Sequence, residues 1–300
     1  MRHRLDSRFL LRCSLPPAVS LSRDGSAKWL VTLEDGNQIE AVAIPQSGRI
    51  TFCVSSQVGC AFGCSFCATA SMGKVRNLGS AEILVQILHL ADASGLAPGA
   101  PFHVVFMGMG EPLDNFDAVL EAFDILTDAA GLGLSWRRVT LSTVGHLPGI
   151  RRLAARAHRP RPAVSLNAAR DRLRDRLMPV NRRWRLAELR EALAEFPTRP
   201  GERITCEYVL LAGENDSRDD HRRLADWTEG LPVRINLIPW NPCPGMPHRR
   251  SSNRSAEAFR DTLLARGLDV SIRFSKGSDV SAACGQLATA TRRHHGRTAS

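Results

Sequence analysis

Short stretches of alternating and helical periodicity follow one another along most of the chain. Residues 29–33 and 38–45 alternate apolar and polar side chains around the turn Glu34-Asp35-Gly36-Asn37, which predicts a β-hairpin. Beyond it, apolar runs of strand length are separated by segments in which apolar residues recur with helical spacing. Strands that alternate with helices form a parallel sheet with right-handed crossovers. The pattern therefore predicts an α/β fold.

About six strand–helix units follow the hairpin. The predicted strands are 49–52, 102–107, 138–142, 163–166, 204–211, 233–238 and 270–274. The predicted helices are 80–91, 118–130, 147–157, a long region broken around Pro179, 217–229 and 256–266. This count predicts an open partial (β/α)6 barrel behind a small β-hairpin. We expect residues 1–24 to be a short N-terminal extension, residues 25–290 to form the barrel domain, and residues 291–300 to be a disordered basic tail.

Composition narrows the class of protein. Hydrophobic residues make up 43% of the chain, enough for a sizeable core. No apolar run reaches the roughly 18–20 residues that a membrane helix needs, so we expect no membrane association. Clustered thiols suit a reducing compartment, which predicts a cytoplasmic protein. The formal net charge of +10 indicates a polyanionic partner.

The positive charge is concentrated in one window. Residues 151–190 hold thirteen arginines against three acidic residues, a surplus as large as that of the whole chain. Solvated helix faces explain many such runs. Arginine also binds phosphate through its bidentate fork, and Trp184 is the only aromatic residue in the window. The window therefore suits phosphate contacts with RNA better than base stacking.

Four of the eight cysteines lie within fifteen residues, at positions 53, 60, 64 and 67. Cys60, Cys64 and Cys67 have the spacing C-x3-C-x2-C, which suits three corners of a [4Fe–4S] cluster with one iron left open. A structural zinc usually takes four ligands, and no second pair lies within local reach. Three closely spaced cysteines also pair poorly as disulfides, and three buried cysteines by coincidence remain the alternative. The spacing resembles that of the radical-SAM superfamily, whose open iron binds S-adenosylmethionine.

Polar residues follow several predicted strands where the strands end. They are Gly110 with Glu111, Ser142, Ser165 with Asn167, and Asn241. Catalytic and binding groups of (β/α) barrels gather at these carboxyl ends. Each signal alone is weak, because glycine turns and capping serines are common. Four in succession predict one ligand that lies across the mouth of the barrel.

Two further residues are ambiguous by themselves. Glu40 lies on the second hairpin strand, where a glutamate is usually a solvent-facing charge. Cys284 precedes a glycine in a predicted loop, and a lone cysteine is usually structural. The loop placement nevertheless suits a reactive, accessible thiol.

Five longer motifs carry a family resemblance that covers nearly the whole chain. They are CVSSQVGC at 53–60, GMGEPL at 108–113, RVTLST at 138–143, NLIPWNP at 236–242 and AACGQL at 282–287. Together they resemble the RlmN/Cfr family of radical-SAM RNA adenine methyltransferases. The resemblance implies that Cys284, Cys53 and Glu40 are catalytic and that Cys60, Cys64 and Cys67 hold the [4Fe–4S] cluster. It assigns S-adenosyl-L-methionine binding to Gly110, Glu111, Ser142, Ser165, Leu166, Asn167 and Asn241.

The resemblance also implies a two-thiol reaction. Cys284 accepts a methyl group from one S-adenosylmethionine, and a radical from a second one activates it for addition to an adenine carbon. Cys53 then forms a transient disulfide with Cys284 and releases the methylated base, while Glu40 accepts a proton. The implied target is adenine C2 of 23S rRNA, and also of tRNA, with an electron donor such as flavodoxin and a monomeric enzyme. The alternatives are adenine C8, another substrate, or an iron–sulfur RNA-binding protein without turnover.

The chain departs from the family pattern at two points. The family usually has Ser-Leu-His where this chain has Ser165-Leu166-Asn167, so an imidazole contact is replaced by an amide that can donate and accept. The family also carries a helical accessory domain before the hairpin, and only about twenty-four residues precede it here. We expect the arginine window to carry correspondingly more of the RNA binding.

Overall fold

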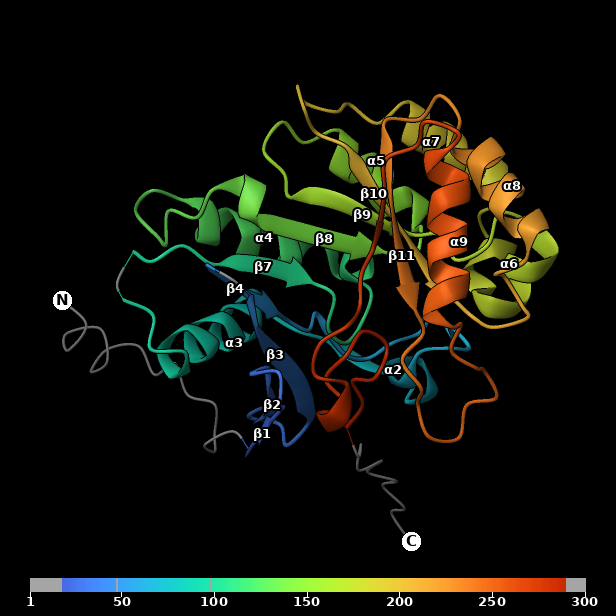
Figure 1. The fold of residues 1–300 in the computed structure, drawn as a ribbon. Helices are drawn as coiled ribbons and strands as arrows, with labels where there is room; N and C mark the ends of the chain where they lie inside the picture. The colour runs from blue at the N-terminus through green and yellow to red at the C-terminus, as the bar shows by residue number, and fades with distance from the viewer. Residues whose placement is uncertain (1–17, 47, 98, 290–300) are drawn as a thin grey trace, which may run out of the picture.

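The computed structural model describes residues 18–46, 48–97 and 99–289. Its main feature is a ten-stranded sheet in the order β1-β2-β3-β4-β7-β8-β9-β10-β11-β12 (Figure 1). Four strands pair antiparallel at one end: β1 (Ala18–Leu21), β2 (Ala27–Thr32), β3 (Gln38–Gln46) and β4 (Arg49–Cys53). From β4 onward the pairing is parallel, through β7 (His103–Phe106), β8 (Val139–Thr143), β9 (Arg161–Ser165), β10 (Ile204–Leu210), β11 (Val233–Pro239) and β12 (Val270–Ile272).

Helices connect the parallel strands. They are α3 (Ser80–Ala93), α4 (Phe116–Thr127), α5 (Leu147–Ala154), α6 (Asp171–Leu177), α7 (Leu186–Ala194), α8 (Arg218–Thr228) and α9 (Asn253–Leu264). The six βα units that run from β4 to α9, followed by β12, confirm the predicted open partial (β/α)6 barrel. Every helix in the described ranges is too short or too polar to cross a lipid bilayer.

Several predicted boundaries differ from the structure. The region broken around Pro179 forms α6, a 3-10 turn at Pro179–Arg182, and α7. Helix α9 begins three residues before the predicted start, because the Ser252 hydroxyl accepts the Ser255 N–H and caps it. Residues 18–21 join the sheet as β1, although they were assigned to the extension. Residues 1–17 and the predicted tail at 291–300 lie outside the described residues.

A second, two-stranded sheet was not predicted. β5 (Gln57–Gly59) and β6 (Lys74–Asn77) pair antiparallel and bracket the cysteine loop, which also contains the short helix α2 (Ala68–Ser71). A side chain at Gly59 is excluded, because its φ is +74° and an added Cβ would lie 1.8 Å from the Gly73 carbonyl oxygen. The two ends of the cysteine loop are thus held together by close packing of the backbone at Gly59 and Gly73.

The C-terminal segment, residues 273–289, returns to the first strands (Figure 1). The Lys276 ammonium donates to the Pro45 carbonyl at 2.5 Å, and the Ala288 N–H donates to the Glu40 carboxylate at 2.9 Å. Next to the cysteine loop, the Ala68 N–H donates to the Gly285 carbonyl at 2.7 Å. The segment that carries Cys284 is therefore held between β3 and the cysteine loop.

Candidate active site

The three cysteines of the predicted cluster motif lie on the loop between β5 and β6. Cys60 and Cys64 are each 8% exposed, Cys67 is half-buried, and all three are free thiols. The loop is held by hydrogen bonds from the Cys60 N–H to the Gly73 carbonyl and from the Ser65 N–H to the Leu177 carbonyl. The three thiols thus share one loop, and their role as cluster ligands stays a prediction.

The electrostatics of these thiols suit a cationic group. Burial raises the pKa of Cys60 to about 12 and also raises the pKa values of Cys64 and Cys67. Cys67 raises the pKa of Cys60 further, and Cys67 and Cys60 raise the pKa of Cys64. A bound metal cluster supplies the positive charge that such thiolates require.

Among the described residues, no group of three or more His, Cys, Asp or Glu side chains could hold a metal ion as it stands. A single zinc would need every sulfur about 2.3 Å from one point. A [4Fe–4S] cluster does not need such a point, because each thiolate binds a different iron. The donor set and its loop therefore fit the cluster.

A cavity adjoins the cysteine loop at the carboxyl ends of the strands, and we call it the upper cavity. Cys64 and Cys67 line it together with most of the predicted ligand-binding residues, namely Gly110, Glu111, Ser142, Ser165, Asn167 and Asn241. Leu166 is fully buried and does not line it. Its volume of about 150 Å³ is below the usual range for small-molecule sites.

Glu111 is rigidly held in the wall of the upper cavity. Its carboxylate is 1% exposed and accepts the Leu113 N–H at 3.1 Å and the Val144 N–H at 2.8 Å. Burial raises its pKa to about 7 in spite of these hydrogen bonds. A cationic ligand group such as an ammonium would restore the charged form and gain an ion pair.

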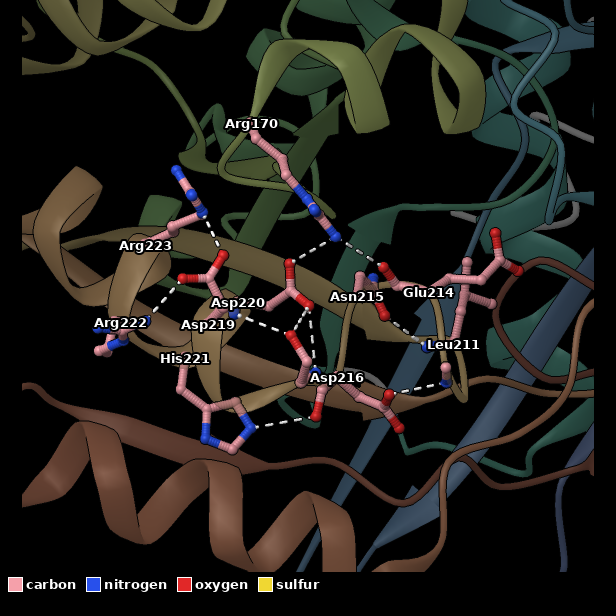
Figure 2. Close-up of polar contacts among 12 residues, drawn as sticks. Arg170, Leu211, Glu214, Asn215, Asp216, Asp219, Asp220, His221, Arg222 and Arg223 are labelled. Carbon is pink, nitrogen blue, oxygen red and sulfur yellow. Dashed lines mark hydrogen bonds and ion pairs between the residues drawn. The ribbon is translucent and has the colours of Figure 1, made fainter.

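Asn167 occupies a special backbone position. Its φ is +57°, in the left-handed region where asparagine is enriched. Its Oδ1 accepts the Val209 N–H at 2.8 Å, and its carbonyl accepts the Asn215 side-chain amide at 2.9 Å. Asn215 also accepts the Leu211 N–H at 2.7 Å within the β10–α8 loop (Figure 2). The asparagine that replaces the family histidine thus joins β9 to the loop after β10.

A larger cavity of about 540 Å³, which we call the lower cavity, shares Cys284 with the upper cavity. Cys53, at the end of β4, lines it, and Cys284 lines both cavities. The two thiols, 231 positions apart, are close enough that Cys284 adds to the effect of burial, which raises the pKa of Cys53 to about 12. The Asn241 amide donates to the Cys284 carbonyl at 3.1 Å and so fixes the backbone beside that thiol.

Glu40 lies elsewhere. It is 4% exposed on β3, forms an ion pair with Lys28 at 2.8 Å and accepts the Ala288 N–H. It lines neither the upper nor the lower cavity. The structure thus places Glu40 where it anchors the C-terminal segment, and its catalytic role stays a prediction.

Three residues of the site were missed from the sequence. Glu207 lines the upper cavity, and Arg273 lines both cavities. Arg273 has a raised pKa, chiefly because of the Cys284 sulfur. Arg174 is 1% exposed and donates to the carbonyls of Val144, Ser165 and Leu166. The sequence offered a signal for two of them. Glu207 is a charged residue inside a largely apolar strand, and Arg273 is a polar residue at the end of a strand.

Comparison with known proteins identifies a family model and closely similar sequences. The radical SAM superfamily model matches residues 54–225. The chain is 45% identical over 287 residues to the dual-specificity RNA methyltransferase RlmN of Pelobacter propionicus, covering 96% of this chain and 81% of the relative. It is 48% identical over 273 residues to the RlmN protein of an Anaeromyxobacter species, covering 89% and 72%.

Solved structures show the same fold. A radical SAM methyltransferase from Sphaerobacter thermophilus superposes with a TM-score of 0.89 at 41% identity, covering 95% of this chain and 84% of that chain. SuiB of Streptococcus suis, in a structure with bound S-adenosylmethionine, superposes with a TM-score of 0.52 at 16% identity, covering 75% and 51%. The second likeness concerns the fold alone.

Proposed function

The chain belongs to the RlmN family of radical SAM RNA methyltransferases, and from that premise we propose its reaction in detail. It adds a methyl group to an adenine ring carbon of RNA, at C2 in preference to C8, through a methylated Cys284. The substrates are 23S rRNA and tRNA. A small reductant protein such as flavodoxin supplies electrons, and the enzyme acts as a monomer.

The cofactors of the family are a [4Fe–4S] cluster and S-adenosylmethionine. When bound, they supply the methyl group and the radical chemistry that an unactivated aromatic carbon requires. Cys60, Cys64 and Cys67 would hold the cluster, since their buried thiols line one loop. Glu111 and the polar groups of the upper cavity would orient S-adenosylmethionine, with the Glu111 carboxylate accepting from its ammonium.

One observation carries the two-thiol proposal: Cys284 lines both the upper cavity, beside Cys64 and Cys67, and the lower cavity, beside Cys53. A thiol in this position can take a methyl group on one side and present it to a base on the other. Cys53, which lines the lower cavity with Cys284, is then the thiol that attacks the Cys284 sulfur and releases the product. Arg273 lines both cavities, so its guanidinium lies in the surroundings of Cys284 on each side of the proposed transfer.

Glu40 is proposed as the proton acceptor. Its Oε2 atom accepts the Ala288 N–H, four residues beyond Cys284. A displacement of the C-terminal segment that frees this carboxylate would bring it toward the reacting base. General bases act within hydrogen-bond reach of the proton they remove.

The test compares Cys284→Ala and Cys53→Ala after anaerobic cluster reconstitution. We expect Cys284→Ala to abolish RNA methylation and to retain the cluster absorbance, because Cys284 is not a cluster ligand. We expect Cys53→Ala to accumulate enzyme covalently joined to RNA. Methylation by Cys284→Ala would refute the two-thiol scheme, and mass spectrometry of the nucleosides separates C2 from C8 products.

A further inference from the structure

The amino ends of the parallel strands carry an unusual set of basic residues. Because parallel strands begin at the same edge of a sheet, these residues gather around the mouth of the barrel opposite the cysteine loop. Each of six successive strands, β4 and β7–β11, has one at or next to its first residue. We call this set the basic collar: Arg49, His103, Arg138, Arg161, Arg203 and Arg234.

The members of the basic collar lie close enough to repel one another. Burial lowers the pKa of His103, and Arg138, Arg49 and Arg161 lower it further. Burial and then Arg234 lower the pKa of Arg161. A cluster of like charges costs free energy in the absence of a counter-ion. An anion bound to the collar would therefore reduce this repulsion.

The collar has little neutralising charge of its own. In the described ranges, Asp269 forms its only ion pairs, with Arg203 at 3.9 Å and Arg234 at 3.8 Å. Arg138 and Arg161 have no side-chain hydrogen bond or ion pair within those ranges, and the Arg234 Nε is buried without a hydrogen bond. Three collar guanidiniums thus retain unused hydrogen-bonding capacity.

The arginine window predicted to bind RNA contains one collar member, Arg161, but most of its other arginines differ in this respect. Arg170 is paired with Asp220 at 3.1 Å and donates to the Glu214 carbonyl (Figure 2). Arg159 is 2% exposed and paired with Glu202, and Arg174 is equally buried. Further ion pairs engage Arg152, Arg156, Arg176 and Arg185. Much of the window's charge therefore stabilises the fold.

The collar is connected to the two thiols. Arg49 and His103 line the lower cavity together with Cys53 and Cys284, and Arg49 and Cys53 are the two ends of β4. Its volume of about 540 Å³ is in the range of small-molecule sites. Phe274 also lines it and is 50% exposed, and an exposed aromatic ring is a suitable platform for an unstacked base.

We propose that RNA docks on the basic collar, with its phosphates against the arginines, and that the target adenine enters the lower cavity past Phe274 to reach Cys284. The base and S-adenosylmethionine then approach the Cys284 sulfur from opposite ends of the barrel. This proposal rests on the proposed function in taking RNA as the substrate. It assigns the docking face, which that function leaves open.

The test removes equal charge from two faces. Arg49, Arg138 and Arg161, which all act on His103, are replaced together by glutamine. The matched control replaces Arg218, Arg249 and Arg254, exposed arginines without a side-chain hydrogen bond or ion pair in the described ranges, which lie outside the collar and both cavities. Reconstituted full-length proteins are titrated with 23S rRNA and tRNA transcripts at several salt concentrations, and thermal melting confirms that each variant folds.

We expect the collar variant to bind RNA at least ~10-fold more weakly, with the slope of log K against log salt reduced by roughly 2–3. The control should keep both values, and Phe274→Leu should lose methylation more than binding. Unchanged binding by a folded collar variant would overturn the proposal. So would an equal loss on replacing Arg172, Arg182 and Arg183, since RNA would then dock beside α6. Wild type that binds RNA without methylating it would refute the proposed function alone.

Discussion

The Arg174 guanidinium joins the carboxyl ends of β8 and β9 beneath the upper cavity. It donates to the carbonyls of Val144 at 2.8 Å, Leu166 at 3.0 Å and Ser165 at 3.2 Å. It also donates to the Asn181 Oδ1 at 3.1 Å, whereas the Leu166 carbonyl has a second donor in the Ala168 N–H. Arg174→Met would therefore leave the Val144 and Ser165 carbonyls and the Asn181 Oδ1 without this donor, at about 1–3 kcal/mol each. Part of that loss is offset, because the substitution also removes a buried charge. Burial disfavours this charge and lowers the Arg174 pKa to about 10. We therefore expect a loss near the lower end, about 3 kcal/mol.

Thermal melting and urea denaturation measure this loss directly. For a domain of this size, about 3 kcal/mol corresponds to a decrease in melting temperature of roughly 5 °C. S-adenosylmethionine binding should also weaken, because Ser165 lines the upper cavity. Arg174→Lys, with a single ammonium in place of the fork, should lose an intermediate amount.

Arg172→Gln provides the control, since Arg172 is exposed on the same helix and should change stability by no more than about 0.5 kcal/mol. If the free energy of unfolding of Arg174→Met lies within 1 kcal/mol of the wild-type value, the carbonyls have found other donors and the reasoning is wrong. If it is destabilised but binds S-adenosylmethionine as tightly as wild type, Arg174 supports the fold without shaping the site.

Two further predictions concern the pH response and the glycine of the site. Burial opposes ionisation of Glu202, but its hydrogen bonds to Arg159 keep its pKa below the usual value. The pair therefore stabilises the fold above about pH 4.3, the pKa of a free glutamate. That stabilisation is lost as the pH falls through the lower pKa of Glu202 in the folded protein. Glu202→Gln should therefore cost about 3–5 kcal/mol at pH 7 and less at pH 3 by urea denaturation, and equal losses would contradict this. Gly110→Ala should weaken S-adenosylmethionine binding, since the φ of Gly110 is +98° and an added Cβ would lie 2.5 Å from Gln57. In the control Gly133→Ala, φ is +61° but the Cβ would meet no neighbour, so only stability should decrease. Equal losses of binding in the two variants would contradict this.

The sequence predicted the barrel and most of the cavity lining because both depend on local signals. Strand and helix periods identify the βα units, and the carboxyl ends of parallel strands must meet at one edge. The residues 110, 142, 165 and 241 were found in this way, and all four line the upper cavity. The cysteine spacing was equally local.

Contacts between distant backbone groups could not be predicted. Arg174 bonds to carbonyls 8, 9 and 30 residues away, and no periodicity specifies an acceptor on the main chain. Net charge likewise counted Arg159 and Arg174 as surface cations, although the fold buries both. The basic collar could not be predicted either. Its members are spread from residue 49 to residue 234, and they come together only because the parallel strands begin at the same edge of the sheet.

The bond between Glu40 and Ala288 has a consequence for biosynthesis. The ribosome delivers β3 and the cysteine loop more than 200 residues before their partner segment. Contacts of such long sequence separation form late in folding. A nascent or truncated chain that stops before residue 284 can thus assemble much of its sheet while it lacks Cys284. Under the proposed two-thiol reaction, such an unfinished polypeptide would be unable to act on the RNA around it.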